Sequence, residues 1–297
     1  MANSKQDMQG KIVVLTGANA GIGRATAQAL VAAGAHVVMA CRNLDKAEAA
    51  RAEIAAAVGG ADRLEPMPLD ISDLASVTRF AAELRGRHAR VDVLINNAGA
   101  WWPERHSSAQ QHELQWATNV LGAHLLTKLL QAPLVAARGR VINVASTAAG
   151  SLDLADVDWN SRPYDGIKAY SATKQADRML SWVWADALAG TGVTVNAMSP
   201  GLVATEFNRS ASGFFKFMFK MMRPLSRTPE KGADTVVWLA SAPELAGKTN
   251  GFYVDRQEKP CKFRESAGVR ALWDLLERQV ADFGRVAAAT GLQVDAV

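Results

Sequence analysis

The chain has little cysteine, no long apolar run and no cluster of basic residues. Only two of its 297 residues are cysteines, Cys41 and Cys261, and their separation gives no metal-ligand spacing. No apolar run approaches the roughly 18 residues of a membrane-spanning helix, and the polar first ten residues lack the apolar core of a signal peptide. The net charge is +4, but the basic residues are scattered. We therefore expect a cytoplasmic protein with no integral membrane segment, no metal site and no nucleic-acid partner.

What the chain does contain is an alternation of short apolar runs with longer alanine-rich segments. The expected strands are 11–16, 36–40, 64–69, 91–95, 140–145, 193–199 and 251–254. The expected helices are 24–33, 45–57, 74–87, 112–131, 169–189, 230–240 and, in an extension over 260–297, 272–280. Continuous Val/Ile strands alternating with helices predict an α/β fold with a Rossmann-type, doubly wound parallel sheet. We expect one domain over residues 1–297, with a C-terminal helical extension.

A glycine-rich turn joins the first expected strand to the first expected helix. It reads Thr16-Gly17-Ala18-Asn19-Ala20-Gly21-Ile22-Gly23. The three glycines allow a tight turn, a close approach of phosphate oxygens and close packing of the helix on the strand. The helix N-terminus then faces a pyrophosphate with its partial positive charge. Three glycines alone would also suit a structural turn, but the strand–turn–helix context favours a dinucleotide site.

The end of the second strand indicates which dinucleotide binds. A carboxylate there would hold the ribose 2′-hydroxyl of NAD, but the strand ends in Cys41-Arg42-Asn43 and has none. The guanidinium of Arg42 can pair with a 2′-phosphate, which favours NADP(H) over the alternative of a solvated surface arginine. Asp70, after the third strand, can accept a hydrogen bond from the adenine amino group or cap the following helix.

Small and polar residues also end the fourth strand, in Asn96-Asn97-Ala98-Gly99. In an open parallel sheet, ligands bind beyond the carboxyl ends of the strands. Asparagine side chains there can tie neighbouring loops together, and the Ala98-Gly99 pair leaves room for a ribose; a plain turn is the alternative. Trp101 and Trp102 follow at once, and we expect them to line the wall of a pocket.

Tyr170 and Lys174 lie one turn apart on one face of an expected helix. A free phenol, with a pKa of about 10, is too weak an acid or base at neutral pH, and an adjacent ammonium lowers its pKa. Ser146, just after the fifth strand, can hydrogen-bond a reacting carbonyl oxygen. Asn119, on the long expected helix, could anchor a water chain that feeds protons to Lys174. Tyrosine and lysine at this spacing are common by chance, so the order of all the motifs makes the set specific.

In this order, from Gly10 to about Val254, the motifs resemble those of the short-chain dehydrogenase/reductase family. The resemblance rests on the TGxxxGxG turn, the NNAG segment, the YxxxK pair and Ser199-Pro200-Gly201 followed by Thr205. It implies that Tyr170 is the general acid/base and that Lys174 binds the nicotinamide ribose. The catalytic set implied is Asn119, Ser146, Tyr170 and Lys174. The cofactor-binding residues implied are Gly17, Asn19, Gly21, Ile22, Gly23, Arg42, Asp70, Asn97, Ala98, Gly99, Tyr170, Lys174, Pro200, Gly201 and Thr205.

A narrower resemblance is to the retinol dehydrogenase-like branch of that family. It rests on four segments: 40–43, 190–196, 253–255 and the helix that carries Leu272-Trp273. The branch generally uses NADP(H) on hydrophobic aldehydes, ketones or alcohols. Many of its animal members carry an N-terminal membrane anchor, which is not expected here. The region after Gly99 and the loop 202–228 do not match, so retinoid specificity does not follow from the resemblance.

The loop 202–228 is unusually rich in aromatic residues and methionine. Its core is Phe214–Met222, and Lys216, Lys220 and Arg223 add positive charge. We expect this loop to be a lid over an apolar substrate, for which adaptable methionines are suited. A subunit or internal packing surface is one alternative, and transient contact with a membrane surface is another.

The sequence therefore predicts an NADPH-dependent reductase/dehydrogenase that interconverts a carbonyl and an alcohol on a hydrophobic small molecule. A non-catalytic NADP-binding sensor is one alternative. A sugar-nucleotide epimerase or dehydratase is a weaker one, because its glycine turn usually has a different spacing and it needs a larger C-terminal domain. Family members often pair through the helices that here carry Asn119 and Tyr170. A homodimer would use that surface unless the C-terminal extension covers it.

Overall fold

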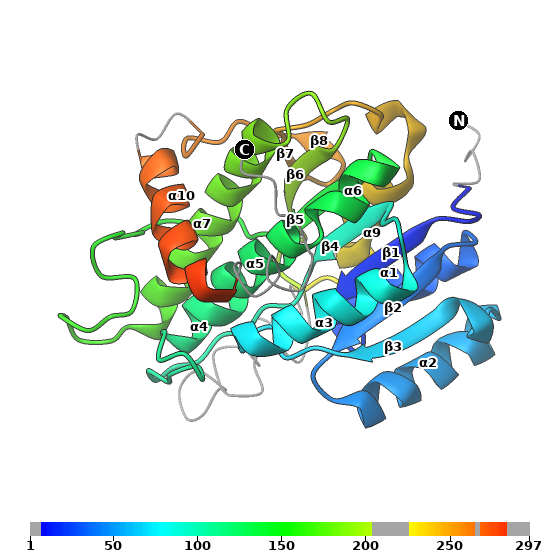
Figure 1. Cartoon of the computed structure of the whole chain (residues 1–297), viewed down its shortest axis with the longest axis horizontal. Coiled ribbons are helices and arrows are strands. Elements are labelled where there is room, and N and C mark those ends of the chain that lie inside the picture. Colours follow the sequence, from blue (N-terminus) through cyan, green and yellow to red (C-terminus); the bar gives the residue numbers. More distant parts are fainter. Residues whose placement is uncertain (1–6, 204–225, 265–267, 284–297) are drawn as a thin grey trace.

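The computed structural model describes residues 7–203, 226–264 and 268–283 of the chain. Within them, one sheet runs in the order β3-β2-β1-β4-β5-β6-β7-β8, and every pair is parallel except β7 with β8 (Figure 1). The strands are β1 (Ile12–Thr16), β2 (His36–Cys41), β3 (Leu64–Pro68), β4 (Val93–Asn96), β5 (Arg140–Val144), β6 (Thr194–Ser199), β7 (Phe252–Val254) and β8 (Gln257–Glu258). This order confirms the predicted doubly wound, Rossmann-type sheet.

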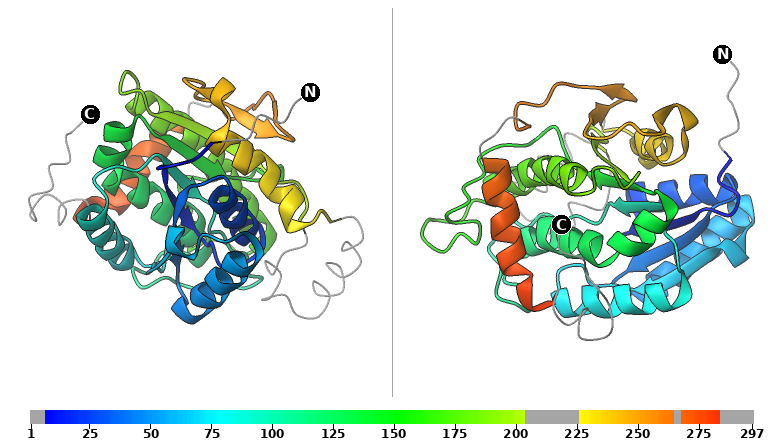
Figure 2. Two further views of the ribbon diagram at one scale, coloured as in Figure 1. Left: turned by 90° about the vertical axis from the view of Figure 1, so that its right-hand side faces the viewer. Right: turned by 45° about the horizontal axis from the view of Figure 1, so that its top comes forward.

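Helices cover both faces of this sheet, as the two views of Figure 2 show. The longer helices are α1 (Gly21–Ala32), α2 (Leu44–Val58), α3 (Leu74–Arg87), α5 (Gly122–Leu129), α6 (Gln131–Ala137), α7 (Gly166–Ala187), α9 (Pro229–Ser241) and α10 (Gly268–Gln279). Successive residues of one strand point to opposite faces: Val13 and Leu15 pack with the α1, α2 and α9 side, and Val14 with the α3, α5 and α7 side. Because both faces are buried, the parallel strands are mostly apolar, and the buried amides of Asn143 and Asn196 donate hydrogen bonds to Ser181 and to the Lys248 carbonyl oxygen.

The strand order reverses between β1 and β4, which both pair with their neighbours in parallel. The crossover helix after β1 packs on one face of the sheet and the one after β4 on the other. In sheets of this kind, ligands bind beyond the carboxyl ends of the two strands at which the order reverses, in the crevice that the diverging connections leave. The glycine turn follows β1 and the NNAG segment ends β4. The topology therefore brings the two predicted cofactor motifs to one edge.

The long helix expected over 112–131 is present over Leu114–Leu129, but it is not a regular α-helix throughout. A short α4 (Leu114–Trp116) leads into a π-helical turn η2 (Ala117–Leu121) that contains Asn119, and then into α5. An extra residue in one helical turn does not disturb the apolar periodicity enough to be seen in the sequence, and such turns are frequent at functional sites. Helix α6 and strand β8 were also not expected. Pro133 lies in the first turn of α6, where a missing N–H is tolerated.

The C-terminal helix α10 packs on the outer side of α7 and reaches α5 (Figures 1 and 2). Its Trp273 ring lies 5.1 Å from that of Trp184 and 5.2 Å from the fully buried His124 imidazole, both edge-on. Glu277 pairs with His124 at 3.0 Å and also with Lys128. The extension thus occupies part of the α5–α7 surface considered above for subunit pairing, and the homodimer stays a prediction.

In the described part of the chain, no single helix combines the length and apolar character needed to cross a membrane. One pair of helices, Leu114–Leu129 with Gln131–Ala137, passes that test only when joined across a 61° bend.

We expect Leu276→Ala to lower the free energy of unfolding by about 2–4 kcal/mol, because Leu276 is fully buried between α10 and α7 and its removal leaves a cavity. Urea unfolding followed by circular dichroism measures this loss. Arg278→Ala, an exposed change on the same helix, is the matched control and should stay within about 0.5 kcal/mol of the parent. Equal stability of the two variants would show that α10 does not contribute to the core.

Candidate active site

The glycine turn has the backbone geometry that a dinucleotide phosphate needs. Gly17 has φ = 68° and Gly21 has φ = 50°, both in the left-handed region that favours glycine. A Cβ on Gly23 would lie 2.1 Å from the carbonyl oxygen of Gly17, so only glycine fits there. The N-cap residue of α1, Ala20, makes no side-chain capping bond, and the first turn holds no acidic residue. The helix N-terminus therefore presents uncompensated N–H groups, as an anion site requires.

Hydrogen bonds fasten this turn to the end of β4. The amide Nδ2 of Asn97 donates to the Thr16 carbonyl oxygen at 2.8 Å. In return, the Thr16 hydroxyl oxygen accepts from the backbone N–H groups of Asn97 and Ala98 at 3.0 and 2.9 Å. Asn96, by contrast, turns inward and donates to Asn143 on β5 at 2.8 Å. Thr16 and Asn97 thus hold the two loops of the crevice in a fixed relation.

Arg42 and Asp70 lie together at the carboxyl ends of β2 and β3. The Arg42 side chain is 73% exposed, and its Nη1 is 4.0 Å from the Asp70 carboxylate. Asp70 accepts from the hydroxyl and the N–H of Ser72 at 2.6 and 3.0 Å. Asp73 is the residue that caps α3, by accepting from the N–H of Ala75. Of the two roles considered for Asp70, helix capping therefore belongs to Asp73.

Ser146, Tyr170 and Lys174 come together at the same edge of the sheet. Lys174 is 5% exposed, and its Nζ lies 5.8 Å from the centre of the Tyr170 ring. That ammonium donates to the Val144 carbonyl oxygen at 3.1 Å and to the Asp177 carboxylate at 2.7 Å. The Ser146 side chain hydrogen-bonds the Tyr170 phenol. The spacing on α7 and the end of β5 thus place a hydroxyl, a phenol and an ammonium in contact range.

Asn119 lies next to this group but bonds to the backbone. Its Oδ1 accepts from the N–H of Ala100 at 2.8 Å, and its Nδ2 donates to the Ala100 carbonyl at 3.1 Å and to the Thr173 hydroxyl at 3.0 Å. It therefore clamps the loop after β4 onto α7. A Cβ on Gly99 would lie 3.5 Å from both Asn119 and Lys174, so Gly99 borders the two side chains. The role of Asn119 in a proton relay stays a prediction.

Burial and neighbouring charges oppose each other in setting the ionisation of Tyr170 and Lys174. It raises the pKa of the Tyr170 phenol and outweighs the lowering by Lys174 and by the Ser146 hydrogen bond; Asp177 adds to the rise. Burial would lower the pKa of Lys174, but the Asp177 carboxylate and the Tyr170 phenol together raise it. Lys174 thus acts on the phenol in the expected direction, although the net shift is upward.

Two residues that sequence reasoning missed support this group from α7. Asp177 contacts Lys174. Its place three residues after the lysine of the YxxxK pair is the one signal in the sequence that could have indicated this contact. The Arg178 Nε donates to the Ser146 carbonyl oxygen at 3.0 Å. Its guanidinium stacks 3.9 Å from the centre of the Phe252 ring on β7. Arg178 therefore fixes the backbone of Ser146, a contact between distant segments that the sequence does not reveal.

The tryptophan pair divides between packing and surface. Trp101 is 3% exposed, and its indole N–H donates to the Gly166 carbonyl oxygen at 3.0 Å, so it fastens its loop to the start of α7. Trp102 is half-buried. A Cβ on Gly166 would lie 2.3 Å from the Trp102 carbonyl oxygen, which shows how closely the loop and the helix approach. Trp101 therefore packs inside the protein, and for Trp102 a place in the wall of a pocket stays a prediction.

The segment that begins at Pro200 is closed at its base. Gly201 has φ = 75° and faces the Arg227 guanidinium. Val203 forms a parallel bridge with Arg227, whose N–H donates to the Leu202 carbonyl oxygen at 2.8 Å. Thr205 and residues 204–225, which hold the expected lid, lie outside the described residues.

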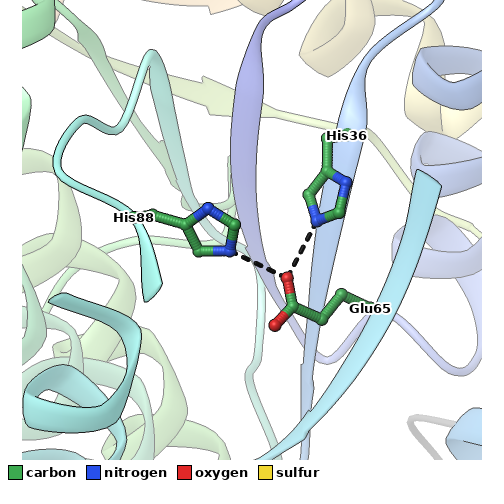
Figure 3. Close-up of side chains that lie close together, drawn as sticks. All are labelled: His36, Glu65 and His88. Atoms are coloured by element: carbon green, nitrogen blue, oxygen red, sulfur yellow. Dashed lines mark hydrogen bonds and ion pairs between the residues drawn. The ribbon is translucent and has the colours of Figure 1, made fainter. Parts of the chain in front are cut away.

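A separate polar cluster lies near the amino ends of β2 and β3, away from this edge. Figure 3 shows the His36 and His88 imidazoles converging on Glu65, each with Nε2 2.8 Å from Oε2, while Arg87 donates to Oε1 at 2.8 Å. The three potential ligand atoms lie within 4.8 Å of one another. However, 2.8 Å is a hydrogen-bond length, and two ligands of a tetrahedral zinc ion would be roughly 3.3 Å apart. The distances in the cluster are those of hydrogen bonds that join β2, β3 and the end of α3. The absence of a metal site stays a prediction.

Glu65→Gln should remove a pH-dependent contribution to stability. Burial would raise the pKa of Glu65, but hydrogen bonds from His36, His88 and Arg87 lower it from 4.5 to about 2. The carboxylate therefore stabilises the fold above pH 4.5 and loses this effect as the pH falls towards 2. We expect the variant to be less stable at pH 7 by about 1 kcal/mol, since the group is partly exposed, and the difference to vanish near pH 2.

Urea unfolding at a series of pH values tests this expectation. Glu83→Gln is the matched control, since Glu83 pairs with the same Arg87 but its side chain is 45% exposed. A pH dependence of Glu65→Gln that matched the parent protein would contradict the assignment.

The reversal in strand order, the glycine turn after β1 and the Tyr170–Lys174 pair together are typical of dinucleotide-binding oxidoreductases. The family model described as short chain dehydrogenase matches residues 11–213, and the chain belongs to that family. Human retinol dehydrogenase 13 is 37% identical over 282 residues, which cover 91% of this chain and 84% of that protein. The chain is therefore similar to the retinol dehydrogenases, as the narrower resemblance implied.

Solved structures agree with this membership. A protein from Mycobacterium paratuberculosis is 30% identical, with a TM-score of 0.73, and the match covers 93% of this chain and 95% of that one. The RhlG/NADP complex from Pseudomonas aeruginosa is 26% identical, with a TM-score of 0.67, and the match covers 84% and 96% of the two chains.

Proposed function

We propose that this protein is an NADPH-dependent reductase/dehydrogenase that interconverts a carbonyl and an alcohol on a hydrophobic small molecule. One observation carries the proposal: Ser146, Tyr170 and Lys174 meet at the carboxyl edge of the sheet, beside a glycine turn shaped for phosphate. Bound there, NADPH supplies the hydride that reduces the carbonyl carbon. The protein's part is to hold the substrate oxygen and to deliver a proton to it.

The roles of the side chains follow from their positions. The Ser146 hydroxyl, half-buried and bonded to the phenol, donates a hydrogen bond to the substrate carbonyl oxygen and stabilises its developing charge. The Tyr170 phenol gives its proton to that oxygen, and the O–H bond of the alcohol forms as the phenol O–H bond breaks. The Lys174 ammonium stabilises the phenolate left behind and holds the ribose. In alcohol oxidation the same proton returns to the phenolate.

The preference for NADPH rests on Arg42. Its exposed guanidinium stands at the end of β2, where an NAD enzyme would place a carboxylate, and Asp70 is 4.0 Å away. Arginine matches a 2′-phosphate because it can form two parallel, charge-assisted hydrogen bonds. The phosphates would lie at Gly17, Gly21 and the N-terminus of α1, and the remaining cofactor-binding residues are proposed as the family resemblance implies.

A hydrophobic substrate is supported by the composition of segment 204–225 and by the retinol dehydrogenase relatives. The loop 202–228, which contains this segment, is proposed as the substrate lid within a single domain. Cytoplasmic location is part of the proposal, and the two cysteines of the described residues, both free, are consistent with a reducing compartment. The alternative is a sensor, which would bind NADP at the same site but would not catalyse a reaction.

Tyr170→Phe should reduce kcat/KM for NADPH oxidation by about 10³-fold with hydrophobic aldehydes, ketones or quinones, because the proton donor is lost. The Kd for NADPH should change by less than about threefold, since the phenol does not carry the phosphates. Tyr253→Phe, a buried tyrosine on β7, is the control and should retain activity. Turnover that survives in Tyr170→Phe would contradict the assignment; NADPH binding by the parent without turnover of any substrate would favour the sensor.

Arg42→Gln should raise the KM for NADPH by about 10–100-fold and leave the KM for NADH nearly unchanged, because a charge-assisted pair with the 2′-phosphate is lost. Arg79→Gln is a matched control: its side chain is 71% exposed, against 73% for Arg42, and it also lies near an aspartate. Steady-state kinetics with both cofactors decides the point. Equal effects of Arg42→Gln on NADPH and NADH would remove the basis for NADP specificity.

A further inference from the structure

A buried carboxylate lies directly beside the lysine of the catalytic group. Asp177 follows Lys174 by three residues on α7, and the side chains of both are only 6% exposed. The Asp177 Oδ2 is 2.7 Å from the Lys174 Nζ, a distance typical of a charge-assisted hydrogen bond. The two groups form a buried ion pair, so the ammonium next to the phenol does not act as an isolated positive charge.

The pair fixes where the ammonium stands. An ammonium has three hydrogens to donate. One is directed at the Val144 carbonyl oxygen on β5 and one at Asp177, which leaves the third for a ribose hydroxyl at the edge of the crevice. Val144 and Asp177 lie on different elements, so together they determine the direction of the third hydrogen. Without Asp177 the lysine chain could rotate about its terminal bonds.

Lys174, Asp177 and the Ser146 hydroxyl all act on the ionisation of the Tyr170 phenol. Lys174 and Ser146 lower its pKa, and Asp177 raises it. From η2 the nearby side chain is the amide of Asn119, which hydrogen-bonds to Ala100 and Thr173. The Arg178 guanidinium, on the same helix, is directed at the Ser146 carbonyl and the Phe252 ring. Asp177 is thus a negative charge that opposes the effect of Lys174 on the phenol.

This offset bears on the pH dependence of carbonyl reduction. A free ammonium about 5–6 Å from a phenol lowers its pKa, because it stabilises the phenolate. A carboxylate paired with the ammonium cancels part of that field. The phenol then stays protonated over a wider pH range, and a protonated phenol is the form that reduces a carbonyl.

We propose that Asp177 is a positioning residue that holds Lys174 and screens its charge from Tyr170, so that the phenol remains a proton donor for carbonyl reduction up to a higher pH. The inference rests on the proposed function, but the effect of Asp177 on the ionisation of Tyr170 can be measured without substrate or cofactor.

The test measures the ionisation of Tyr170 directly. The chain has only three tyrosines, so the ultraviolet absorbance of tyrosinate can be followed as the pH rises, and subtraction of the Tyr170→Phe titration isolates Tyr170. Asp177→Asn keeps a hydrogen-bond acceptor for Lys174 but removes the charge. We expect the Tyr170 titration to move down by about one pH unit in this variant. Asp186→Asn, the same change at an exposed position of α7, should leave it in place.

A shift of less than about 0.3 pH unit in Asp177→Asn, or an upward shift, would overturn the proposal. If Asp177→Asn does not fold, Asp177→Ser, which also removes the charge, takes its place: a Tyr170 titration about one pH unit below that of the parent supports the screening, and an unchanged or higher titration refutes it.

The pH profile of the rate provides a second readout that a purely structural role would not move. The alkaline limb of kcat for reduction should shift down by the same one unit, giving about tenfold slower reduction at a fixed pH on that limb. A shifted titration in a protein that turns over no substrate would refute the proposed function and leave the screening by Asp177 standing. A parent enzyme that reduces carbonyls, with identical profiles for Asp177→Asn and the parent, would refute the screening alone.

Discussion

Burial of both faces of the parallel sheet is the constraint on which the rest of the molecule depends. With helices on either side, most strand side chains are apolar, and polar groups inside the strands, such as Asn196, are hydrogen-bonded there. The reversal between β1 and β4 leaves the carboxyl edge for the polar loops. Each functional group described above stands on that edge: the glycine turn after β1, Arg42 after β2, Gly99 after β4 and Ser146 after β5. The chemistry is thus held by elements that the hydrophobic core fixes in place.

Hydrogen bonds between polar side chains and the backbone then fix the loops at that edge. Thr16 and Asn97 join the loops of β1 and β4, Asn119 clamps the next loop onto α7, and Arg178 holds the backbone of Ser146. These bonds are buried or partly buried and link segments far apart in the chain. Because an unpaired polar group inside a protein is costly, each of these side chains stabilises the site only when its partner is in place. The conformation of each loop of the site therefore depends on the loops to which it is hydrogen-bonded.

Much of this arrangement could be predicted from the sequence, because apolar runs and glycine positions are local signals. The parallel sheet, the bounds of α3 and the meeting of Tyr170, Lys174 and Ser146 followed from spacing and order. The π turn at Asn119 could not, since one extra residue barely alters the apolar pattern. Asp177 was missed because a carboxylate on a helix is usually solvated, and its burial depends on how β5 and α7 pack. Contacts of that kind are set by tertiary structure alone.

The closed base of segment 204–225 has a further consequence, for how such a site can change over time. The bridge between Val203 and Arg227 joins the two ends through backbone groups, so their meeting does not depend on the residues between them. Pairing through the main chain places little requirement on which side chains stand at Leu202 and Val203. The path of the chain between β6 and α9 is therefore fixed at this base by backbone geometry. A lineage can exchange side chains at the base while the register of the two ends stays the same.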